Sequence, residues 1–445
     1  MITGLRIQNF KSLEDTGWLP IRPLTFLVGP NSSGKSSVLQ CLLMLKQAAI
    51  STDITTPLVS MGYYTPNLGP YPDFIFGHDV DRLLTISLGF HPPVPLPRFV
   101  LKQLQLTELP EINFAASFGC KRRAQIYLQN AEFELPPYKI VLNKLSKIGM
   151  GNYEVRFLKD GVAGAPLKGA RPRKFYGIGI FPFRRRIETP YVNLASIFSH
   201  EIEFLFEDRL YYIGPLREWP SRVYPAAGET PSDVGVRGEK AIDLLWMEKQ
   251  QKKKGLINTV NHWLKEFGFA DKTKVKKVME NYYQMLVEPV LGLEVNFADI
   301  GFGASQLLPI IVEGFHAPGG STLLVEQPEI HLHPKAQALL GDLFVDITKE
   351  MKALIVETHS EYLLSRVRRL IAEGRIKRED VAIYFFTLKE GGTHIQEIQL
   401  NELGQFEFEQ WPEDFFAEDL KEAAAHFEAM AKAKIGQITT SNGQA

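Results

Sequence analysis

A glycine-rich loop near the start of the chain constrains its fold more than any other feature. The segment GPNSSGKS, residues 29–36, has the spacing Gly-x4-Gly-Lys-Ser of a phosphate-binding loop. The apolar run 24–28 directly before it predicts a buried strand, and residues 37–49 carry apolar side chains at helical spacing. A strand, a glycine loop and a helix in this order hold nucleotide phosphates, so we expect a P-loop α/β domain.

The residue types in this loop match the chemistry of phosphate binding. Its glycines let backbone N–H groups close around the β-phosphate, Lys35 places a cation on the β and γ oxygens, and Ser36 offers a hydroxyl to Mg²⁺. The start of the following helix adds partial positive charge. ATP and Mg²⁺ are therefore the expected cofactors. The predicted ATP-binding residues are Gly29, Pro30, Asn31, Ser32, Ser33, Gly34, Lys35, Ser36 and Ser37.

Two later strands end in polar residues that suit the same site. The apolar segment 322–325 ends in Glu326, which is predicted to reach the water shell of the Mg²⁺ ion that Ser36 holds. The segment 353–356 runs into Glu-Thr-His-Ser, where His359 can contact the γ-phosphate. A helix cap is the alternative interpretation of this second motif. Its position after the first motif favours the functional one.

A second glycine-containing motif lies, in sequence, between the phosphate loop and these strands. Residues 301–306, Gly-Phe-Gly-Ala-Ser-Gln, precede an apolar helical segment at 307–312. Glycine followed by Ser and Gln at a helix start can form an anion site. An ordinary glycine turn with a serine cap is the alternative.

Taken in order, these motifs resemble the ABC-type ATPase heads of the RecF, SMC and OLD families. The resemblance is closest to the bacterial OLD-like AAA-15/AAA-21 ATPases, and it implies an α/β fold with an ABC-type P-loop ATPase head. It also implies that two heads pair around ATP, as a homodimer or a higher homo-oligomer. The segments that carry it are 5–13, 29–37, 212–217, 233–239 and 326–334, and residues 404–416 resemble the small DUF3696 domain found at the end of some members.

Two motifs depart from the family pattern. In the signature segment, Gln306 takes the place of the family glutamine and Gly303 falls where a phosphate-contacting serine is usual, so that Gly303, Ala304, Ser305 and Gln306 are the predicted residues acting in trans. The usual Asp-Glu pair reads Glu326-Gln327, and a glutamine cannot accept a proton. Either Glu329 replaces it, or hydrolysis is slow and the protein is a nucleotide-gated switch. The predicted catalytic set is Glu326, Gln327, Glu329 and His359.

The pattern of the remaining chain divides it into four parts. We expect residues 1–82 and 205–400 to form the head, 83–204 to be a β-rich insertion, and 401–445 to be the DUF3696-like segment with a helix at 416–434 and a frayed tail. Short alternating segments at 84–88, 124–128 and 153–157 predict the strands of the insertion. No apolar run is long enough to span a membrane, and the two cysteines have no metal spacing, so a cytoplasmic protein is expected.

For two further features, the basic clusters and a pair of histidines, we favour a non-functional interpretation. Basic clusters occur at 121–123, 171–174, 184–186 and 272–277, with aromatics between the middle two, and would suit DNA or RNA contacts. With a formal net charge of −1, solvated loop charge is the simpler interpretation. His331 and His333 alone make a poor metal site.

These features lead to one main functional hypothesis and two alternatives. The main one is an ATPase whose ATP-dependent head pairing acts as a sensor or switch for a separate nucleic-acid-acting effector, a nuclease or toxin, in bacterial anti-phage defence. The alternatives are a RecF-like DNA repair ATPase and an assembly scaffold that binds ATP with little turnover. A transporter subunit is disfavoured by the atypical signature and the β-rich segment.

Overall fold

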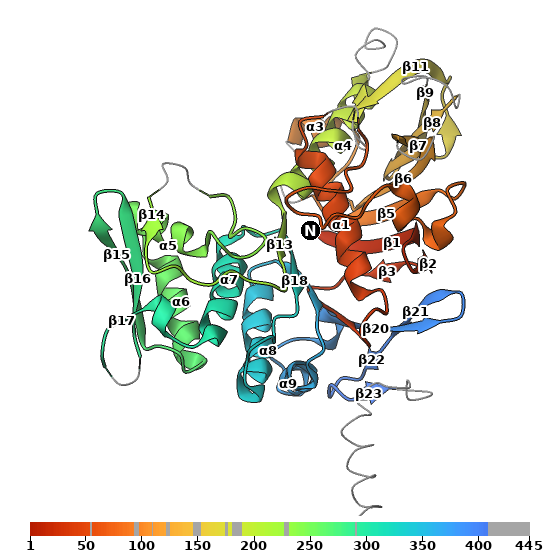
Figure 1. Cartoon of the computed structure of the whole chain (residues 1–445). Helices are drawn as coiled ribbons and strands as arrows, with labels where there is room; N and C mark the ends of the chain where they lie inside the picture. The colour runs from red at the N-terminus through yellow and green to blue at the C-terminus, as the bar shows by residue number, and fades with distance from the viewer. Residues whose placement is uncertain are drawn as a thin grey trace, which may run out of the picture.

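The computed structural model describes residues 1–53, 56–92, 98–108, 110–121, 125–145, 153–173, 177–179, 189–226, 231–289 and 292–407. Two large β-sheets and the helices around them make up most of the molecule, and a small sheet with two helices forms a lobe at the left of Figure 1. The phosphate loop lies where the two large sheets come together.

The strand before the phosphate loop lies inside a six-stranded sheet with the order β13-β18-β19-β4-β20-β21. All neighbours are parallel except the last pair, so the predicted parallel strands are confirmed. The carboxyl ends of β4, β18 and β19 therefore meet at one edge, where ligands of open α/β sheets bind. The strands are β13 (Leu210–Ile213), β18 (Thr322–Glu326), β19 (Ala353–Glu357), β4 (Leu24–Val28), β20 (Val381–Lys389) and β21 (Gly392–Glu397).

Both faces of this sheet are buried, which explains why its strands read as continuous apolar runs. Along β19, Leu354 and Val356 pack into one hydrophobic core and Ile355 packs into the other. β18 repeats the alternation, with Leu324 on the opposite face from its neighbours in the strand. The core that contains Ile355 and Leu324 includes helix α1 (Lys35–Ile50). The core that contains Leu354 and Val356 includes helices α7 (Phe302–His316), α8 (Pro334–Thr348) and α9 (Glu361–Ala372).

The second large sheet is antiparallel and has eleven strands. The β-rich segment does not form a sheet of its own, because β5 pairs directly with β1, with Ile86 opposite Ile7, and β6 to β12 extend the same sheet. Figure 1 shows this sheet running from β1 up to β11. Its strands are β1 (Ile2–Phe10), β2 (Leu13–Asp15), β3 (Leu19–Pro20), β5 (Leu84–Phe90), β6 (Ile112–Lys121), β7 (Gln125–Leu135), β8 (Tyr138–Lys144), β9 (Tyr153–Lys159), β10 (Val162–Ala163), β11 (Leu167–Arg173) and β12 (Gly177–Gly179).

The helix after the phosphate loop joins the two sheets. α1 contacts β1 and also α4 (Thr189–Asp208), a 20-residue helix that the sequence analysis did not predict. α4 closes the β-rich segment and leads directly into β13. Three short helices complete this half: α2 (Tyr71–Phe74), η1 (Phe76–His78) and α3 (Arg98–Gln103).

The side lobe packs on α7. The helix predicted at 257–267 is α6 (Gly255–Glu266), and its contacts with α7 join the lobe to the head. The lobe also contains β14 (Tyr224–Pro225), α5 (Ala241–Gln250), β15 (Lys272–Met279), β16 (Tyr282–Glu288), β17 (Val295–Asn296) and η3 (Phe297–Asp299). The chain beyond α9 adds η4 (Arg378–Asp380), β22 (Gln399–Leu400) and β23 (Phe406–Glu407), and the last two lie below the head in Figure 1.

Two sequence predictions concern residues beyond these ranges. The helix expected at 416–434 lies outside the described residues, as do the basic residues 184–186 and the aromatics beside them. Within the described ranges, no helix combines the length and apolar character needed to cross a membrane.

Candidate functional site

The phosphate loop has a backbone that only glycine permits at its two ends. Gly29 has φ 139° and Gly34 has φ 102°, and residues that carry a Cβ atom rarely adopt either backbone conformation. A Cβ atom on Gly29 would lie 2.2 Å from the carbonyl oxygen of Phe386 in β20. The glycine spacing therefore reflects a close backbone approach as well as the turn itself.

Lys35 lies inside the curve of this loop. Its Nζ donates hydrogen bonds to the carbonyl oxygens of Gly29, at 3.0 Å, and Pro30, at 2.6 Å, and the residue is only 3% exposed. Burial lowers the pKa of this ammonium group, and the carboxylates of Glu357 and Glu329 counteract the effect. An anion at the loop would meet a cation that is desolvated and already in place.

A pocket of about 500 Å³ opens over the loop and the start of α1. Most of the predicted phosphate-binding residues line it, together with side chains that the sequence analysis did not assign. Its lining residues are Lys11, Ser12, Asn31, Ser32, Ser33, Gly34, Lys35, Ser36, Ser37, Gln40, Gln327 and Glu357. The pocket brings together the end of β1, the phosphate loop and the ends of β18 and β19.

Two glutamates end neighbouring strands at this edge. Glu326 and Glu357 are paired in register at the ends of β18 and β19, and they are 9% and 3% exposed. Burial, followed by the charge of Glu357, raises the pKa of Glu326 to about 7. Burial also raises the pKa of Glu357, while its bond with Ser36 and the charge of Lys35 oppose the rise. The two carboxylates therefore share a site with little access to water.

The phosphate-loop serine contacts Glu357. The Ser36 hydroxyl donates to Oε1 of Glu357 at 2.9 Å, while Glu326 accepts a hydrogen bond at 2.9 Å from the Tyr212 hydroxyl of β13. The sequence analysis paired Ser36 with Glu326. The strand order places β19 between β4 and β18, so the carboxylate nearest to the phosphate loop belongs to Glu357.

The residues after Glu326 form a tight loop against β19. Gln327 has φ 44° and donates its backbone N–H to the carbonyl oxygen of Glu357 at 2.8 Å. Glu329 is 9% exposed, and its carboxylate accepts the backbone N–H of His359 at 2.6 Å. The Glu329 carboxylate is thus engaged with the backbone at the end of β19, and Gln327 lines the pocket.

His359 follows β19 at the start of the turn into α9, within reach of the electrostatic effect of Lys35. Its side chain is exposed, and its pKa is lowered by partial burial and by the positive charge of Lys35. A mainly neutral imidazole near Lys35 can donate or accept a hydrogen bond at a phosphate oxygen.

Arg217 and the residues that follow it connect this site to the start of α7. Its guanidinium donates to the carbonyl oxygen of Glu326 at 2.7 Å, and burial lowers its pKa to about 10. Two residues further on, the Trp219 ring stacks on Phe302 at 4.0 Å, at the start of α7. Residues 217–219 therefore link the end of β18 with the predicted signature helix.

The predicted signature residues lie on the first turns of α7 and are largely inside the protein. Ser305 is 6% exposed and donates its hydroxyl to the carbonyl oxygen of Phe302 at 2.7 Å, and Gln306 is 1% exposed. A Cβ on Gly303 would approach the carbonyl oxygen of His331 to 3.1 Å. Ala304 is also buried, so the exposed position at this helix start is its N-cap, Gly301.

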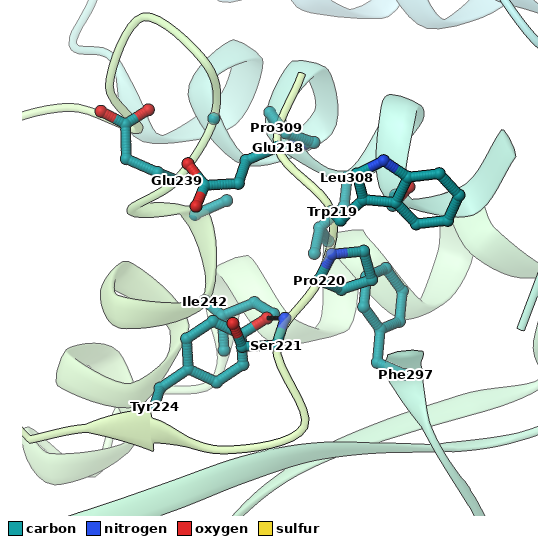
Figure 2. A pocket seen from close by; sticks show the side chains of 13 residues that line it. Glu218, Trp219, Pro220, Ser221, Tyr224, Glu239, Ile242, Phe297, Leu308 and Pro309 are labelled. Atoms are coloured by element: carbon teal, nitrogen blue, oxygen red, sulfur yellow. Dashed lines mark hydrogen bonds between the residues drawn. The ribbon is translucent and has the colours of Figure 1, made fainter. Parts of the chain in front are cut away.

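A second, smaller pocket lies behind this helix start. Figure 2 shows Trp219 and Pro220 on one side of it, Tyr224 and Phe297 below and Pro309 of α7 above. The Ser221 N–H donates a hydrogen bond to the Tyr224 hydroxyl, with a donor–acceptor distance of 2.8 Å. Its volume of about 40 Å³ holds a water molecule or two and excludes a nucleotide.

In the described part of the chain, His331, His333 and two lysines of the 272–277 cluster contact other residues of the protein. His333 caps α8, where its Nδ1 accepts the Lys335 N–H, and the His331 ring lies against Phe302. Lys274 and Lys276 form ion pairs with Glu288 and Glu294. Among the described residues, no group of three or more His, Cys, Asp or Glu side chains is arranged to hold a metal ion alone.

Sequence reasoning missed several members of the site. Glu357 carried the same signal as Glu326, a buried strand ending in an acid, and was not assigned a role. Gln40 lies one turn beyond Ser36 on α1, and Lys11 follows β1 directly, so both required the tertiary arrangement to be recognised.

Comparison with protein families matches three parts of the chain. The family described as "AAA ATPase domain" matches residues 1–81, and "AAA domain, putative AbiEii toxin, Type IV TA system" matches residues 173–365. The family "Protein of unknown function (DUF3696)" matches residues 376–425. The first two matches contain the phosphate loop and the Glu326 strand respectively.

Among curated proteins, the chain is similar to the OLD nuclease of Thermus scotoductus, with 24% identity over 377 residues. The match covers 81% of this chain and 59% of the nuclease, so the chain spans little more than half of that relative. With the three family matches, it confirms the predicted resemblance to the OLD-like AAA ATPases.

Solved structures similar to this chain include SMC head domains. The head from Thermotoga maritima is 11% identical, with a TM-score of 0.41 over 90% of this chain and 99% of that one. The head from Pyrococcus furiosus, solved with the C-terminal domain of ScpA, is 10% identical, with a TM-score of 0.47 over 97% and 99%.

Proposed function

We propose that this chain, an OLD-like AAA ATPase with an ABC-type P-loop head, is a nucleotide-operated switch that binds Mg-ATP and hydrolyses it slowly. The observation that carries the proposal is the convergence of Lys35, Ser36 and two buried glutamates at one edge of the parallel sheet, beside a pocket of about 500 Å³. This combination suits the binding of nucleotide phosphates with a divalent cation.

The donor set fits a magnesium ion. The Ser36 hydroxyl and the glutamate carboxylates are oxygen ligands, and Oε2 of Glu357 is buried without a hydrogen-bond partner among the described residues. Mg²⁺ in nucleotide sites takes one or two carboxylates and completes its shell with phosphate oxygens and water. When bound, the ion would neutralise charge on the phosphates. The phosphate loop and Lys35 would orient them.

The surroundings of the two candidate bases support slow turnover. Gln327 can position a water but cannot take its proton. Oε1 of Glu329 accepts the backbone N–H of His359, which holds this carboxylate at the end of β19 and outside the lining of the pocket. Hydrolysis would accelerate when a partner reshapes the loop from 327 to 331. The same observation keeps the scaffold alternative, in which ATP is bound and barely hydrolysed.

ATP binding itself is tested by Lys35→Ala. The substitution removes the cation inside the loop and should abolish measurable binding of Mg-ATP in a calorimetric titration. Lys265→Ala, an exposed lysine on α6, is the matched control and should bind as the wild type does. Equal affinities for wild type and Lys35→Ala would refute the assignment of the site.

We further propose that two heads pair around ATP, with the start of α7 facing the partner's nucleotide. Ser305 is too buried to be a clean test, but Gly301 is exposed and has open space around its Cβ position. Gly301→Arg should leave ATP binding intact and abolish ATP-dependent dimers in light scattering. The control is Gly255→Arg, an exposed glycine at the start of α6. Unchanged dimers in Gly301→Arg would contradict this pairing.

The proposed output of the switch is a separate effector that acts on nucleic acid, in anti-phage defence. The similarity to an OLD nuclease supports a nucleic-acid context. Affinity purification from the native host with ATP or ADP tests this. Recovery of a nuclease or toxin in a nucleotide-dependent manner is expected, and recovery of a permease would refute it.

A further inference from the structure

We propose that Lys121 and Lys144, which lie against the ring of Tyr127 at one end of the antiparallel sheet, bind the phosphate backbone of a nucleic acid. This inference goes beyond the proposed function, which places the action on nucleic acid in a separate effector. It assigns a direct nucleic-acid contact to this chain. It involves no residue of the nucleotide site, so it stands or fails independently of ATP binding.

Four neighbouring strands bring these residues to one end of the sheet. β6 ends at Lys121 and β8 ends at Lys144, while β7 begins at Gln125 and β9 begins at Tyr153. The antiparallel registers pair Lys121 with Gln125 and Lys144 with Tyr153, and β7 pairs with β8 between them. The four strand ends therefore lie next to one another, in the upper right of Figure 1.

The ring of Tyr127 is the centre of this group of residues. Lys144 Nζ lies 4.0 Å from the centre of the ring, and Lys121 Nζ lies 5.7 Å from it. A second ring, that of Tyr153, has its centre 5.8 Å from Lys144 Nζ. A Cβ atom on Gly119 of β6 would lie 2.7 Å from the Tyr127 hydroxyl, so the glycine leaves room for this ring. We call these two lysines and two tyrosines the lysine–tyrosine cluster.

The two positive charges of the cluster are not neutralised by the protein. Within the described ranges, neither Lys121 nor Lys144 forms an ion pair, and no carboxylate acts on the pKa of Lys144. Burial, followed by the charge of Lys121, lowers that pKa to about 8. Two like charges held together without a counter-charge are unfavourable, and a bound anion would offset this repulsion.

Other basic side chains of the protein are paired with acids. Lys274 and Lys276 of the 272–277 cluster both pair with Glu294. Arg82, which comes shortly before β5 in the same sheet, pairs with Glu14. Solvated or paired charge explains these positions. The same interpretation does not explain two lysines that the fold brings together around an aromatic ring.

The chemistry of the cluster fits a nucleic acid. Lysine ammonium groups neutralise backbone phosphates and release the counterions condensed on the polymer. Aromatic rings beside such cations are typical of surfaces that contact single strands. Lys121 and Lys144 are both partly exposed, so a ligand can reach them. Their strands have one strand between them and lie roughly 10 Å apart, so a polymer with regularly spaced phosphates can contact both.

The test measures binding of labelled single-stranded and duplex DNA and RNA to the full chain by fluorescence anisotropy over a range of salt concentrations. Lys121→Gln and Lys144→Gln should each weaken binding severalfold. Each should also lower the slope of log affinity against log salt by roughly 0.7 for single strands and 0.9 for duplex DNA. Lys144→Arg keeps the charge and should keep the slope. Lys276→Gln removes a lysine that is already paired with Glu294, and should bind as the wild type does.

A wild type that binds neither DNA nor RNA would overturn the proposal. Unchanged affinity and slope in both glutamine variants, or an equal loss in Lys276→Gln, would also overturn it. Polyglutamate serves as a competitor: if it displaces the oligonucleotide as effectively as unlabelled DNA does, the cluster recognises acidic protein and the nucleic-acid assignment is wrong. Thermal unfolding checks that each variant folds, and if Lys144→Gln does not fold, Lys121→Gln and Lys144→Arg decide the outcome.

Discussion

Glu313 on α7 should make the stability of this protein depend on pH in a predictable direction. The residue is 1% exposed, and its Oε2 accepts the Val234 N–H at 2.7 Å. Burial, and to a lesser degree the charge of Asp233, raises its pKa to about 8, while the hydrogen bond from Val234 and the charges of Lys46 and Lys352 partly oppose this rise. The folded protein therefore keeps a proton on Glu313 at neutral pH, whereas the unfolded chain does not.

The sign and size follow from this difference in proton binding. Between the ordinary glutamate pKa of 4.5 and about 8, the folded state binds more protons than the unfolded state, so the free energy of unfolding falls as pH rises. From pH 5 to 7.5 the expected loss from Glu313 alone is roughly 3 kcal/mol, at about 1.4 kcal/mol per pKa unit. The pH range stops at 7.5 because burial lowers the pKa of Lys46 to about 8. Loss of the proton from Lys46 above that pH would raise the free energy of unfolding with pH, opposite to the effect of Glu313.

The assay is the difference in thermal midpoint between Glu313→Gln and wild type from pH 5 to 7.5. Glutamine keeps the acceptor for Val234 and cannot ionise, so Glu313→Gln should gain on the wild type by several degrees as pH rises. Taking the difference cancels other titrating groups, such as Glu326. Glu266→Gln, an exposed glutamate on α6, should follow the wild type at every pH. Parallel curves for Glu313→Gln and wild type would refute the buried, protonated state.

Two further predictions concern the nucleotide site. Gly29→Ala should lower the free energy of unfolding by at least about 2 kcal/mol more than Gly374→Ala, and it should abolish ATP binding. Both residues have positive φ, but of the two only Gly29 would place its new Cβ against a backbone oxygen. Denaturant unfolding and an ATP titration check this, and equal losses of unfolding free energy in the two variants would contradict it. Gln327→Glu should raise basal phosphate release severalfold, because it supplies a proton acceptor in the pocket wall. A fast wild type that the substitution does not accelerate would count against the slow switch.

Local interactions explain what could be predicted without the tertiary structure. The strand, loop and helix around Lys35 are contiguous, so their apolar spacing and glycines are visible within about 25 residues of sequence. The buried parallel strands were recognisable because both of their faces are apolar. The glutamates at the ends of these strands could be recognised as candidate site residues, but the sequence does not show which of them lies nearest to the phosphate loop.

The tertiary structure decided which of these candidates meet. Ser36 and Glu357 are 321 positions apart, and their contact depends on β19 lying between β4 and β18, an order set by the packing of helices on both faces of the sheet. The burial of Ser305 and the continuation of the β1 sheet into residues 84–179 are also non-local. Sequence periodicity reports which face of a strand is buried, but it carries no information on which strand becomes its neighbour, because that choice depends on packing between segments far apart in the chain.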